Sequence, residues 1–493
     1  MTTYPEPSTA TPARPGGLRT LVRKLCLIAA AALGLCAPTA QAATRMTITG
    51  RGFGHGIGMS QYGAYGYSLH LKGYSEILAH YYTGTTLAQL DSNPEVRVLL
   101  QGGRRSVGFT GAVGAGGRGL STARSYSVRL RRGQLVLRNS AGKRLGTTAG
   151  PLRVDAPIGQ PLKLLGTSTP GVTNGLYRGS LLISASGSGL VAVNALNLED
   201  YVRGVVSNES PSGWPAEALK AQAVAARTYA ITTNAGGATF DQYADTRSQM
   251  YRGAESETSS TDAAVAATRG QVVTYQGRPV TTYFFSTSGG ETEDIENSFI
   301  GALPEPWLRA VVDPFDAVSP KHRWGPYRYT RAQVEAKLGG LVRGHFKRIK
   351  ITQRGVSPRV VRAQVVGTRG KVSVTGPQLR ARFGLFDTWA FFTTVTSRPK
   401  TPKPPNVPPP ATPSGGVTPA VRAAMAHMPR LAGSISPARA GRWFRVERRT
   451  GARWTLAADA VLGRGGRYSV AVPGAGTYRV VLGKIVGPAV RIG

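Results

Sequence analysis

Hydrophobic residues alternate with polar ones along much of the first half of the chain. Short apolar runs such as VRVLL, YSVRL, QLVLR, SLLIS and LVAVN occur between residues 96 and 193, separated by glycine-containing turns. A two-residue period is typical of strands that bury one face. The pattern therefore predicts a β-rich segment over residues 95–195, with no long helix in it.

The period changes to that of a helix after Asn197. Apolar residues recur at helical spacing from Leu198 to Val205, and Asn197 with Asp200 three residues later predicts a capped N-terminus. A second helix is predicted from Pro215 to about Ile231, because proline suits the first helical position. Residues 261–270 predict a third helix.

The last hundred residues have a different composition. Residues 399–419 are rich in proline, which predicts an extended linker. We place the bounds of this linker at residues 397–420. Arginine-rich β-runs such as WFRVERR and RYSVAV follow between residues 442 and 492. We therefore expect a small, basic, all-β module over residues 421–493.

The first 42 residues have the features of a secretory leader. Basic residues up to Lys24 precede an apolar stretch from Leu25 to Leu35, and Ala40-Gln41-Ala42 matches a cleavage site. The apolar stretch is short for a membrane span. We expect residues 1–42 to be a signal peptide cleaved near Ala42, and the protein to be secreted; retention of the segment as an anchor is the alternative.

Cysteine and histidine usage argues against a metal site. Both cysteines, Cys26 and Cys36, lie in the leader, so the mature chain would have no thiol for a disulfide or a metal. The histidines are scattered and form no H-E-x-x-H pair. We expect no metal and no cofactor.

The formal net charge of +36 implies an anionic partner. A general compositional bias toward arginine would also produce it. Export argues against nucleic acid, which would require the leader to be misassigned. The leading anion is then an acidic cell-wall polymer, and the terminal module is the segment expected to bind it, with solvated arginines as an equal alternative.

Two stretches are candidates for chemistry. Glu209 lies in the turn predicted between the first two helices, where an isolated glutamate is usually a solvated or capping residue. The glycine-rich stretch RGFGHGIGMSQYGAYG covers residues 51–66. It breaks the G-x-G-x-x-G pattern at Met59 and lacks the lysine and the βαβ setting of a phosphate loop, so it is not predicted to bind a nucleotide.

Three stretches together resemble the SpoIID/LytB family, which includes stage II sporulation protein D and amidase enhancers. They are NLEDYVRGVVSNESPSGWPAEALKAQAVAARTYA (197–230), FSTSGGETE (285–293) and VTGPQLRARFGL (374–385). The resemblance covers about residues 46–396. It implies an α+β fold, in which a β-rich domain over 43–396 has a few packing helices around a cleft. Its catalytic core would be 196–396, and the all-β module follows.

The resemblance also implies an activity. Enzymes of the family are lytic transglycosylases that cut peptidoglycan glycan strands whose stem peptides have been removed, and their catalytic glutamate falls on Glu209. Hydrolases usually need two carboxylates. A lytic transglycosylase uses the 6-hydroxyl of the sugar as its nucleophile and leaves 1,6-anhydro ends, so one residue can act first as acid and then as base.

That role requires a raised pKa for Glu209. A helix N-terminus and Arg227 would lower this pKa, whereas apolar cover from Trp214 or Tyr201 would raise it. The sequence leaves open which effect prevails. Arg227 follows Glu209 by eighteen residues and cannot touch it along a straight helix, so we expect it to contact the substrate or the loop from Ser286 to Gly290; a structural arginine is the alternative.

The loop 286–290 offers hydroxyl and backbone N–H groups suited to sugars, a plain turn being the alternative. Residues 54–64 resemble the family's Gly-His-Gly-x-Gly-Met-Ser-Gln-Tyr-Gly-Ala motif, which usually closes the domain. Here the motif segment (46–90) comes first, so the chain looks circularly permuted. The expected substrate-binding residues are Arg227, Ser286, Ser288, Gly289, Gly290, His55, Ser60, Gln61, Tyr201 and Gln222.

The permutation predicts a contact between distant segments. We expect residues 51–65 to pack against 375–392 and beside Glu209, with His55 close to that glutamate. A rival hypothesis is a wall-binding amidase enhancer without catalysis, whose partner would be a cell-wall amidase.

Overall fold

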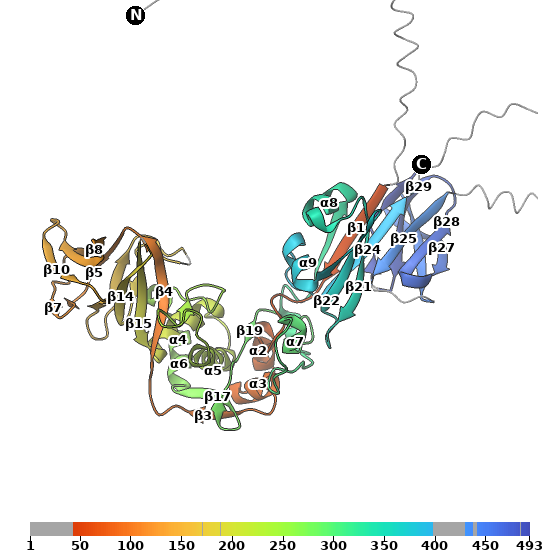
Figure 1. Cartoon of the computed structure of the whole chain (residues 1–493). Coiled ribbons are helices and arrows are strands. Elements are labelled where there is room, and N and C mark those ends of the chain that lie inside the picture. Colours follow the sequence, from red (N-terminus) through yellow and green to blue (C-terminus); the bar gives the residue numbers. More distant parts are fainter. Residues whose placement is uncertain (1–42, 170, 188, 398–428, 437–440, 484) are drawn as a thin grey trace, which may run out of the picture.

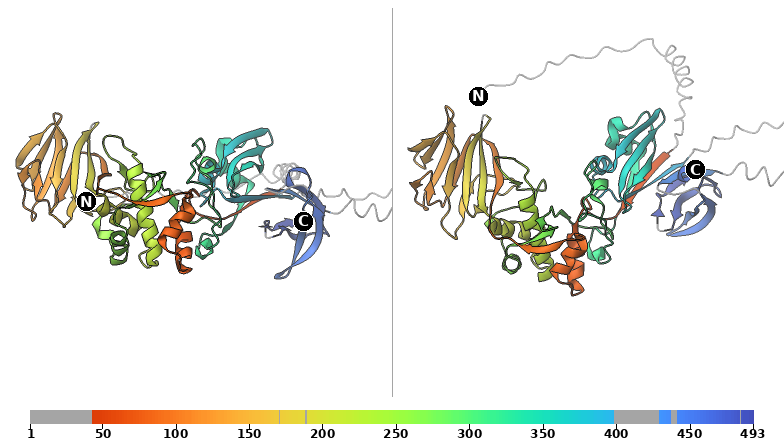
Figure 2. Two further views of the ribbon diagram at one scale, coloured as in Figure 1. Left: turned by 90° about the horizontal axis from the view of Figure 1, so that it is seen from below. Right: turned by 60° about the horizontal axis from the view of Figure 1, so that its bottom comes forward.

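The computed structural model describes residues 43–169, 171–187, 189–397, 429–436, 441–483 and 485–493. The expected signal peptide and nearly all of the expected linker lie outside these residues. Figure 1 shows two sheets at one end, helices in the middle and further sheets at the other end, and Figure 2 shows the same order from two other directions. Within the described ranges, every helix is too short or too polar to serve as a membrane span.

The alternating segment forms two sheets that share one hydrophobic core, including Val98, Phe109 and Ile183. The first sheet contains, in order, β16 (Gln242–Tyr243), β4 (Glu95–Arg104), β15 (Gly189–Asn197), β14 (Ser180–Ser186), β11 (Leu152–Asp155), β6 (Gly114–Ala115) and β7 (Arg118–Gly119). The second contains β10 (Arg144–Thr148), β9 (Gln134–Asn139), β8 (Ser125–Arg131), β5 (Ser106–Thr110), β12 (Leu162–Leu165) and β13 (Leu176–Tyr177). The prediction of a β-rich segment here is confirmed.

The helices are α2 (Gln61–Leu69), α3 (Tyr74–Tyr81), α4 (Leu198–Glu209), α5 (Ala216–Thr232), α6 (Ser259–Ala267), α7 (Ile295–Ser298), α8 (Arg331–Leu338) and α9 (Gly376–Phe383). Helices α8 and α9 pack against strands at the other end of the molecule from α5 (Figure 1). The Asn197 side chain accepts a hydrogen bond from the Asp200 N–H and caps α4, as predicted. The alanine-rich side of α5 is buried, and α2, α3, α4 and α6 all pack against this helix.

The first strand of the described chain lies in one sheet with strands from its C-terminal half. Its order is β20 (Trp324–Thr330), β1 (Ala43–Gly50), β24 (Ala390–Ser397), β25 (Arg430–Ser436) and β28 (Arg467–Ala471). Strands β1 and β24 are antiparallel, with Ala43 opposite Ser397 and Gly50 opposite Ala390. Since β25 and β28 extend this sheet, the C-terminal strands are joined to it by backbone hydrogen bonds.

The remaining strands complete the molecule. A three-stranded sheet contains β21 (Phe346–Arg354), β22 (Val360–Gly367) and β23 (Gly370–Thr375). Near the C-terminus lie β27 (Arg453–Val461), β26 (Trp443–Thr450), β29 (Gly476–Leu482), β30 (Ile485–Val486) and β31 (Val490–Ile492). Between the helices lie β18 (Arg278–Pro279), β17 (Gln271–Tyr275) and β3 (Thr86–Gln89), and the pair β19 (Phe284–Phe285) and β2 (Met59–Ser60). The structure is thus β-rich with a smaller helical part, as the α+β prediction stated.

The predicted contact of the glycine-rich stretch with residues 375–392 is confirmed. The Arg51 N–H donates to the Trp389 carbonyl at 3.0 Å, and the Gly54 N–H donates to the Phe386 carbonyl at 3.1 Å. Strand β2 pairs in parallel with β19, which places Ser60 opposite Phe285. These contacts bring the stretch 51–66 beside the loop 286–290.

Candidate functional site

Glu209 is the last residue of α4, one position before the loop in which the sequence placed it. Its side chain is half-buried and has two uncharged hydrogen-bond donors. The Met250 backbone N–H donates to Oε1 at 2.7 Å, and the Gln61 Nε2 donates to Oε2 at 3.2 Å. Both carboxylate oxygens are therefore oriented by groups far from Glu209 in the sequence.

Burial raises the pKa of Glu209 above its ordinary value, although the hydrogen bonds from Met250 and Gln61 act in the opposite direction. Arg227, the cation expected to lower this pKa, is bound elsewhere. The helix end that carries Glu209 is a C-terminus, whose partial negative charge does not favour a carboxylate. Burial therefore prevails, and the carboxyl group keeps its proton at higher pH than an exposed glutamate.

Gln61 is the residue through which the glycine-rich stretch reaches Glu209. It is the first residue of α2, and its Nε2 also lies 3.0 Å from the Glu209 carbonyl oxygen and 3.3 Å from the Gln222 Oε1. Gln222 on α5 is 1% exposed, so the expectation that it contacts the substrate is wrong. Its Oε1 instead accepts a hydrogen bond from the Gln61 amide.

The structure corrects the expected role of Arg227. Its side chain is fully buried, and its Nε and Nη2 each donate to a different oxygen of Glu199 at 2.8 Å. Nη1 also donates to the Gln271 carbonyl at 3.2 Å. Because these contacts join α4, α5 and β17, Arg227 is the structural arginine that the sequence had left as the alternative, and it does not face the substrate.

Tyr201 requires the same correction. Its ring is fully buried and stacks on Tyr251 at a centroid distance of 5.3 Å, while its hydroxyl donates to the Gln249 Oε1 at 2.9 Å. The proton of its hydroxyl is thus donated to another protein side chain. Tyr201 fixes the segment that ends in Met250, whose N–H contacts Glu209, but it does not contact a ligand.

The loop 286–290 is less available than expected. The Ser288 and Gly289 N–H groups donate to the two carboxylate oxygens of the buried Asp316, at 2.8 and 2.9 Å, and the Gly290 N–H donates to the Ser288 Oγ at 3.0 Å. Ser288 is fully buried. The expectation of free N–H groups is therefore wrong at Ser288, Gly289 and Gly290, and only Ser286 keeps a half-buried hydroxyl, which bonds Thr287.

Ser60 is also a structural residue. It is fully buried, its Oγ donates to the Asp316 Oδ1 at 3.0 Å, and the same oxygen accepts the Gly63 N–H at the start of α2. The expectation that Ser60 contacts the substrate is wrong, because a helix cap and a buried carboxylate use all of its hydrogen bonds. Asp316 thereby links the cap of α2 to the loop 286–290.

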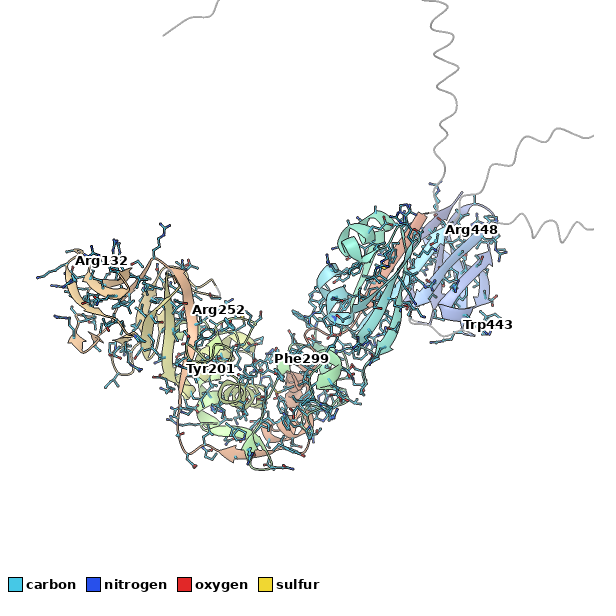
Figure 3. All side chains as sticks on the ribbon, in the orientation of Figure 1. Arg132, Tyr201, Arg252, Phe299, Trp443 and Arg448 are labelled. Atoms are coloured by element: carbon cyan, nitrogen blue, oxygen red, sulfur yellow. The ribbon has the colours of Figure 1, made fainter. Side chains whose placement is uncertain are left out.

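His55 lies among aromatic rings and not against Glu209. Its Nδ1 accepts the Ile57 N–H, so its Nε2 carries the proton that is donated to the Phe284 carbonyl at 3.0 Å. Burial lowers the pKa of His55 to about 3, which keeps the ring neutral. None of its hydrogen bonds in the described residues involves Glu209, so no hydrogen bond joins His55 to that glutamate. Figure 3 shows Phe299, whose ring packs against His55, apart from Tyr201 of α4.

Sequence reasoning missed three residues of this site. Glu199 neutralises Arg227, Asp316 organises the loop 286–290, and the Met250 backbone binds Glu209. A backbone donor has no side-chain signature. The acidic residues are single carboxylates far from their partners in the chain, and nothing in their local sequence distinguishes them from solvated ones. Among the described residues, no three His, Cys, Asp or Glu side chains lie together to hold a metal ion.

The segment that contains Glu209 is similar to a known protein family. The SpoIID family model, described as Stage II sporulation protein, matches residues 186–275, which include Glu209. Stage II sporulation protein D of Bacillus subtilis is 32% identical over 211 residues, which are 39% of this chain and 60% of that protein. The amidase enhancer of the same organism is 41% identical over 103 residues, which are 21% of this chain and 14% of that protein.

An uncharacterized protein of Brachyspira hyodysenteriae is 45% identical over 135 residues, covering 27% of this chain and 37% of its own length. This chain therefore spans about three fifths of the sporulation protein and less of the other two. The matched segment contains α4, Glu209 and α5, which are the elements that build the site. These matches, which all fall on part of the chain, support membership of the SpoIID/LytB family.

Proposed function

We propose that this protein is a peptidoglycan lytic transglycosylase in which Glu209 acts as the single acid and base. The environment of Glu209 carries the proposal. A carboxyl group whose pKa is raised by burial, and whose partners Met250 and Gln61 are uncharged, is suited to act as a general acid. The segment that contains it matches the SpoIID family.

The reaction would proceed in two proton transfers. Protonated Glu209 donates its proton to the glycosidic oxygen as the bond to the anomeric carbon breaks. The resulting carboxylate then takes the proton from the 6-hydroxyl of the same sugar as that oxygen attacks the anomeric carbon. The products are a free hydroxyl on the departing sugar and a 1,6-anhydro ring, and Glu209 returns to its protonated form. Met250 and Gln61 would hold the carboxylate in position during the step in which it is charged.

The partners of Glu209 favour the transfer over hydrolysis. Among the described residues, the groups that hydrogen-bond its carboxylate are the Met250 N–H and the Gln61 amide, and neither is a second carboxylate. A hydrolase would need such a group to activate water or to form a covalent adduct. The substrate's own hydroxyl removes that requirement.

The expected substrate is a glycan strand stripped of its stem peptides. We place the protein outside the cytoplasm at the cell wall, because its leader has the features of a signal peptide and its charge of +36 suits an anionic wall. The arginine-rich C-terminal strands are proposed to bind an acidic wall polymer. Figure 3 shows Arg448 at this end of the molecule.

We further propose that the Gly-His-Gly stretch is circularly permuted and still completes the site. Two contacts support this: β1 pairs with β24 along its whole length, and Gln61 donates to Glu209. Chain ends that lie together tolerate such a rearrangement. The residue that reaches Glu209 is then Gln61 and not His55.

The test is mass analysis of digests of peptide-stripped glycan. The full chain should release fragments with 1,6-anhydro ends, each one water lighter than the corresponding hydrolysis product. Glu209→Gln should abolish this release, and Glu255→Gln should not, since Glu255 is an exposed glutamate that no described hydrogen bond holds. Ordinary reducing ends from the unmodified chain would refute the transglycosylase assignment.

The match to an amidase enhancer favours a second candidate function. In that case the protein binds the wall, stimulates a cell-wall amidase and cleaves no glycan. Wall binding and amidase stimulation that survive Glu209→Gln, without release of glycan fragments by the unmodified chain, would establish the enhancer and exclude the enzyme.

A further inference from the structure

Three aromatic rings from two segments form a stack beside the candidate site. The Trp214 indole stacks on the Tyr65 ring, with centroids 4.9 Å apart and planes 25° apart. Tyr62 stands edge-on to Trp214 at 5.0 Å and to Tyr65 at 6.3 Å. All three side chains are half-buried. The rings are thus fixed against one another while part of each remains accessible.

The glycines of α2 determine which way these tyrosines face. A side chain at Gly63 would overlap Tyr81 and Asp313, and one at Gly66 would overlap Phe315. The glycine side of α2 therefore packs against the protein. Gln61 and Tyr65 are four residues apart and share the other side of the helix. The same side of α2 thus carries the amide that contacts Glu209 and one of the stacked rings.

Both segments of the stack are directly attached to the candidate site. Tyr62 follows Gln61, whose Nε2 lies 3.2 Å from the Glu209 Oε2. Trp214 lies in the short loop between Glu209 and α5, where its backbone N–H donates to the Pro211 carbonyl at 3.0 Å. The stack therefore occupies the border of the region around Glu209, formed on one side by α2 and on the other by the α4–α5 loop.

The polar atoms of these rings differ from those of other aromatic residues in the described part of the chain. Among the described residues, neither the Tyr62 and Tyr65 hydroxyls nor the Trp214 indole N–H takes part in a hydrogen bond that the structure contains. Other aromatic residues use theirs internally: the Trp307 indole donates to the Thr281 carbonyl and the Trp324 indole to the Gly52 carbonyl. An aromatic surface with free polar edges suits a ligand that has both an apolar face and hydroxyl groups.

We propose that Trp214, Tyr65 and Tyr62 form a binding subsite for an N-acetylhexosamine ring of the glycan next to the bond that Glu209 cleaves. A pyranose ring presents a face of C–H groups, which packs on an aromatic ring, and a rim of hydroxyl and acetamido groups, which the phenol and indole edges can bind. The choice of ligand rests on the proposed function. The stack would hold the strand in register while Glu209 acts.

Binding of a β-1,4-linked N-acetylglucosamine oligomer tests the subsite apart from the reaction. The full chain carrying Glu209→Gln is titrated with the oligomer by isothermal calorimetry, so that cleavage does not interfere. Adding Trp214→Ala should raise the Kd about tenfold or more, because truncation of a central aromatic anchor typically has this effect. Adding Trp443→Ala should not change the Kd, since Trp443 lies 67% exposed on the distant C-terminal sheet (Figure 3).

Tyr65→Phe provides a variant that keeps the stack and removes one hydroxyl. It should weaken binding less than Trp214→Ala and leave the thermal unfolding midpoint unchanged, which separates lost contact from lost folding. Equal Kd values with and without Trp214, or no binding of the oligomer by the Glu209→Gln chain, would overturn the subsite. If the unmodified chain yields no 1,6-anhydro ends but Glu209→Gln still binds through Trp214, the proposed reaction fails and the subsite stands.

Discussion

The buried ion pair between Arg227 and Glu199 provides a direct test of the structural role assigned to this arginine. Arg227→Ala removes two hydrogen bonds of 2.8 Å to the Glu199 carboxylate and those to the Gln271 and Val265 carbonyls, at 3.2 and 3.3 Å. The Glu199 side chain is 12% exposed, and it then retains the hydrogen bond that the Gly270 N–H donates to it at 3.0 Å. A buried carboxylate is left without its counter-charge.

Removing one partner of a buried ion pair costs about 3–5 kcal/mol of the free energy of unfolding. With an m-value of about 3 kcal/mol per molar urea, the urea midpoint should fall by about 1 to 1.7 M. The double variant Glu199→Leu with Arg227→Met should be less destabilised than Arg227→Ala, since it leaves no unpaired charge. Arg203→Ala is the matched control. Its pairs with Asp200 and Asp262 are long, at 3.8 and 3.7 Å, and partly exposed, so about 1 kcal/mol or less is expected.

The measurement is urea unfolding followed by tryptophan fluorescence, with glycan cleavage measured on the fraction that remains folded. Arg227→Ala should lose stability, and its folded fraction should keep its KM for glycan. A variant that unfolds at the same urea concentration as the unmodified chain but binds glycan more weakly would refute the reasoning. That result would return Arg227 to the substrate-binding role that the family resemblance implies.

Three further predictions follow from individual contacts. Gln61→Leu removes a hydrogen-bond donor that lowers the pKa of Glu209. The alkaline limb of the pH profile of kcat/KM should therefore move to higher pH. An unchanged limb would exclude the hydrogen bond between Gln61 and Glu209 as an influence on this pKa. Asp313 is buried and its pKa is raised from 3.8 to about 7, so the folded state holds an extra proton between these values. Its contribution to stability is therefore present below about pH 4 and lost as pH rises through 7, by up to about 4 kcal/mol. Urea unfolding at pH 5 and 8 should show about 2–3 kcal/mol of this loss, because the remainder has already occurred by pH 5, and Asp313→Asn should reduce it. Gly63→Ala should lower the melting temperature by an amount equivalent to about 1–3 kcal/mol, through overlap with its neighbours, whereas Gly102→Ala, with no atom within 4 Å of the new Cβ, should not.

Local patterns along the chain predicted the elements that depend on neighbouring residues. The two-residue period before residue 195 became strands β4 to β15, and Asn197 became the cap of α4, because pleat and helix periodicity and capping act within a few residues. Glu209 was found through a long motif, although it is the last residue of α4 and does not lie in the turn predicted after that helix. The packing of the stretch 51–66 against residues 375–392 also followed, because the order of the family motifs had already indicated it.

The roles of the polar side chains could not be read from the sequence. Arg227, Ser60 and Gln222 have the same residue types as sugar-binding groups, and only their partners reveal that Glu199, Asp316 and Gln61 use them internally. The same holds for the loop 286–290, whose N–H groups bind Asp316. Whether a hydrogen-bonding group faces a ligand depends on long-range burial, which no short segment encodes.

The sequence alone determined the β-rich framework, helices α4, α5 and α6 and the key glutamate, because these depend on periodicity, capping and a contiguous motif, whereas it did not predict α2. The tertiary structure decided the pKa of Glu209, the choice of Gln61 over His55 as its neighbour, and the assembly of Trp214 with two tyrosines. Each of these depends on groups more than a hundred residues apart in the chain. Desolvation and close packing act through space, so they appear only when the chain has folded.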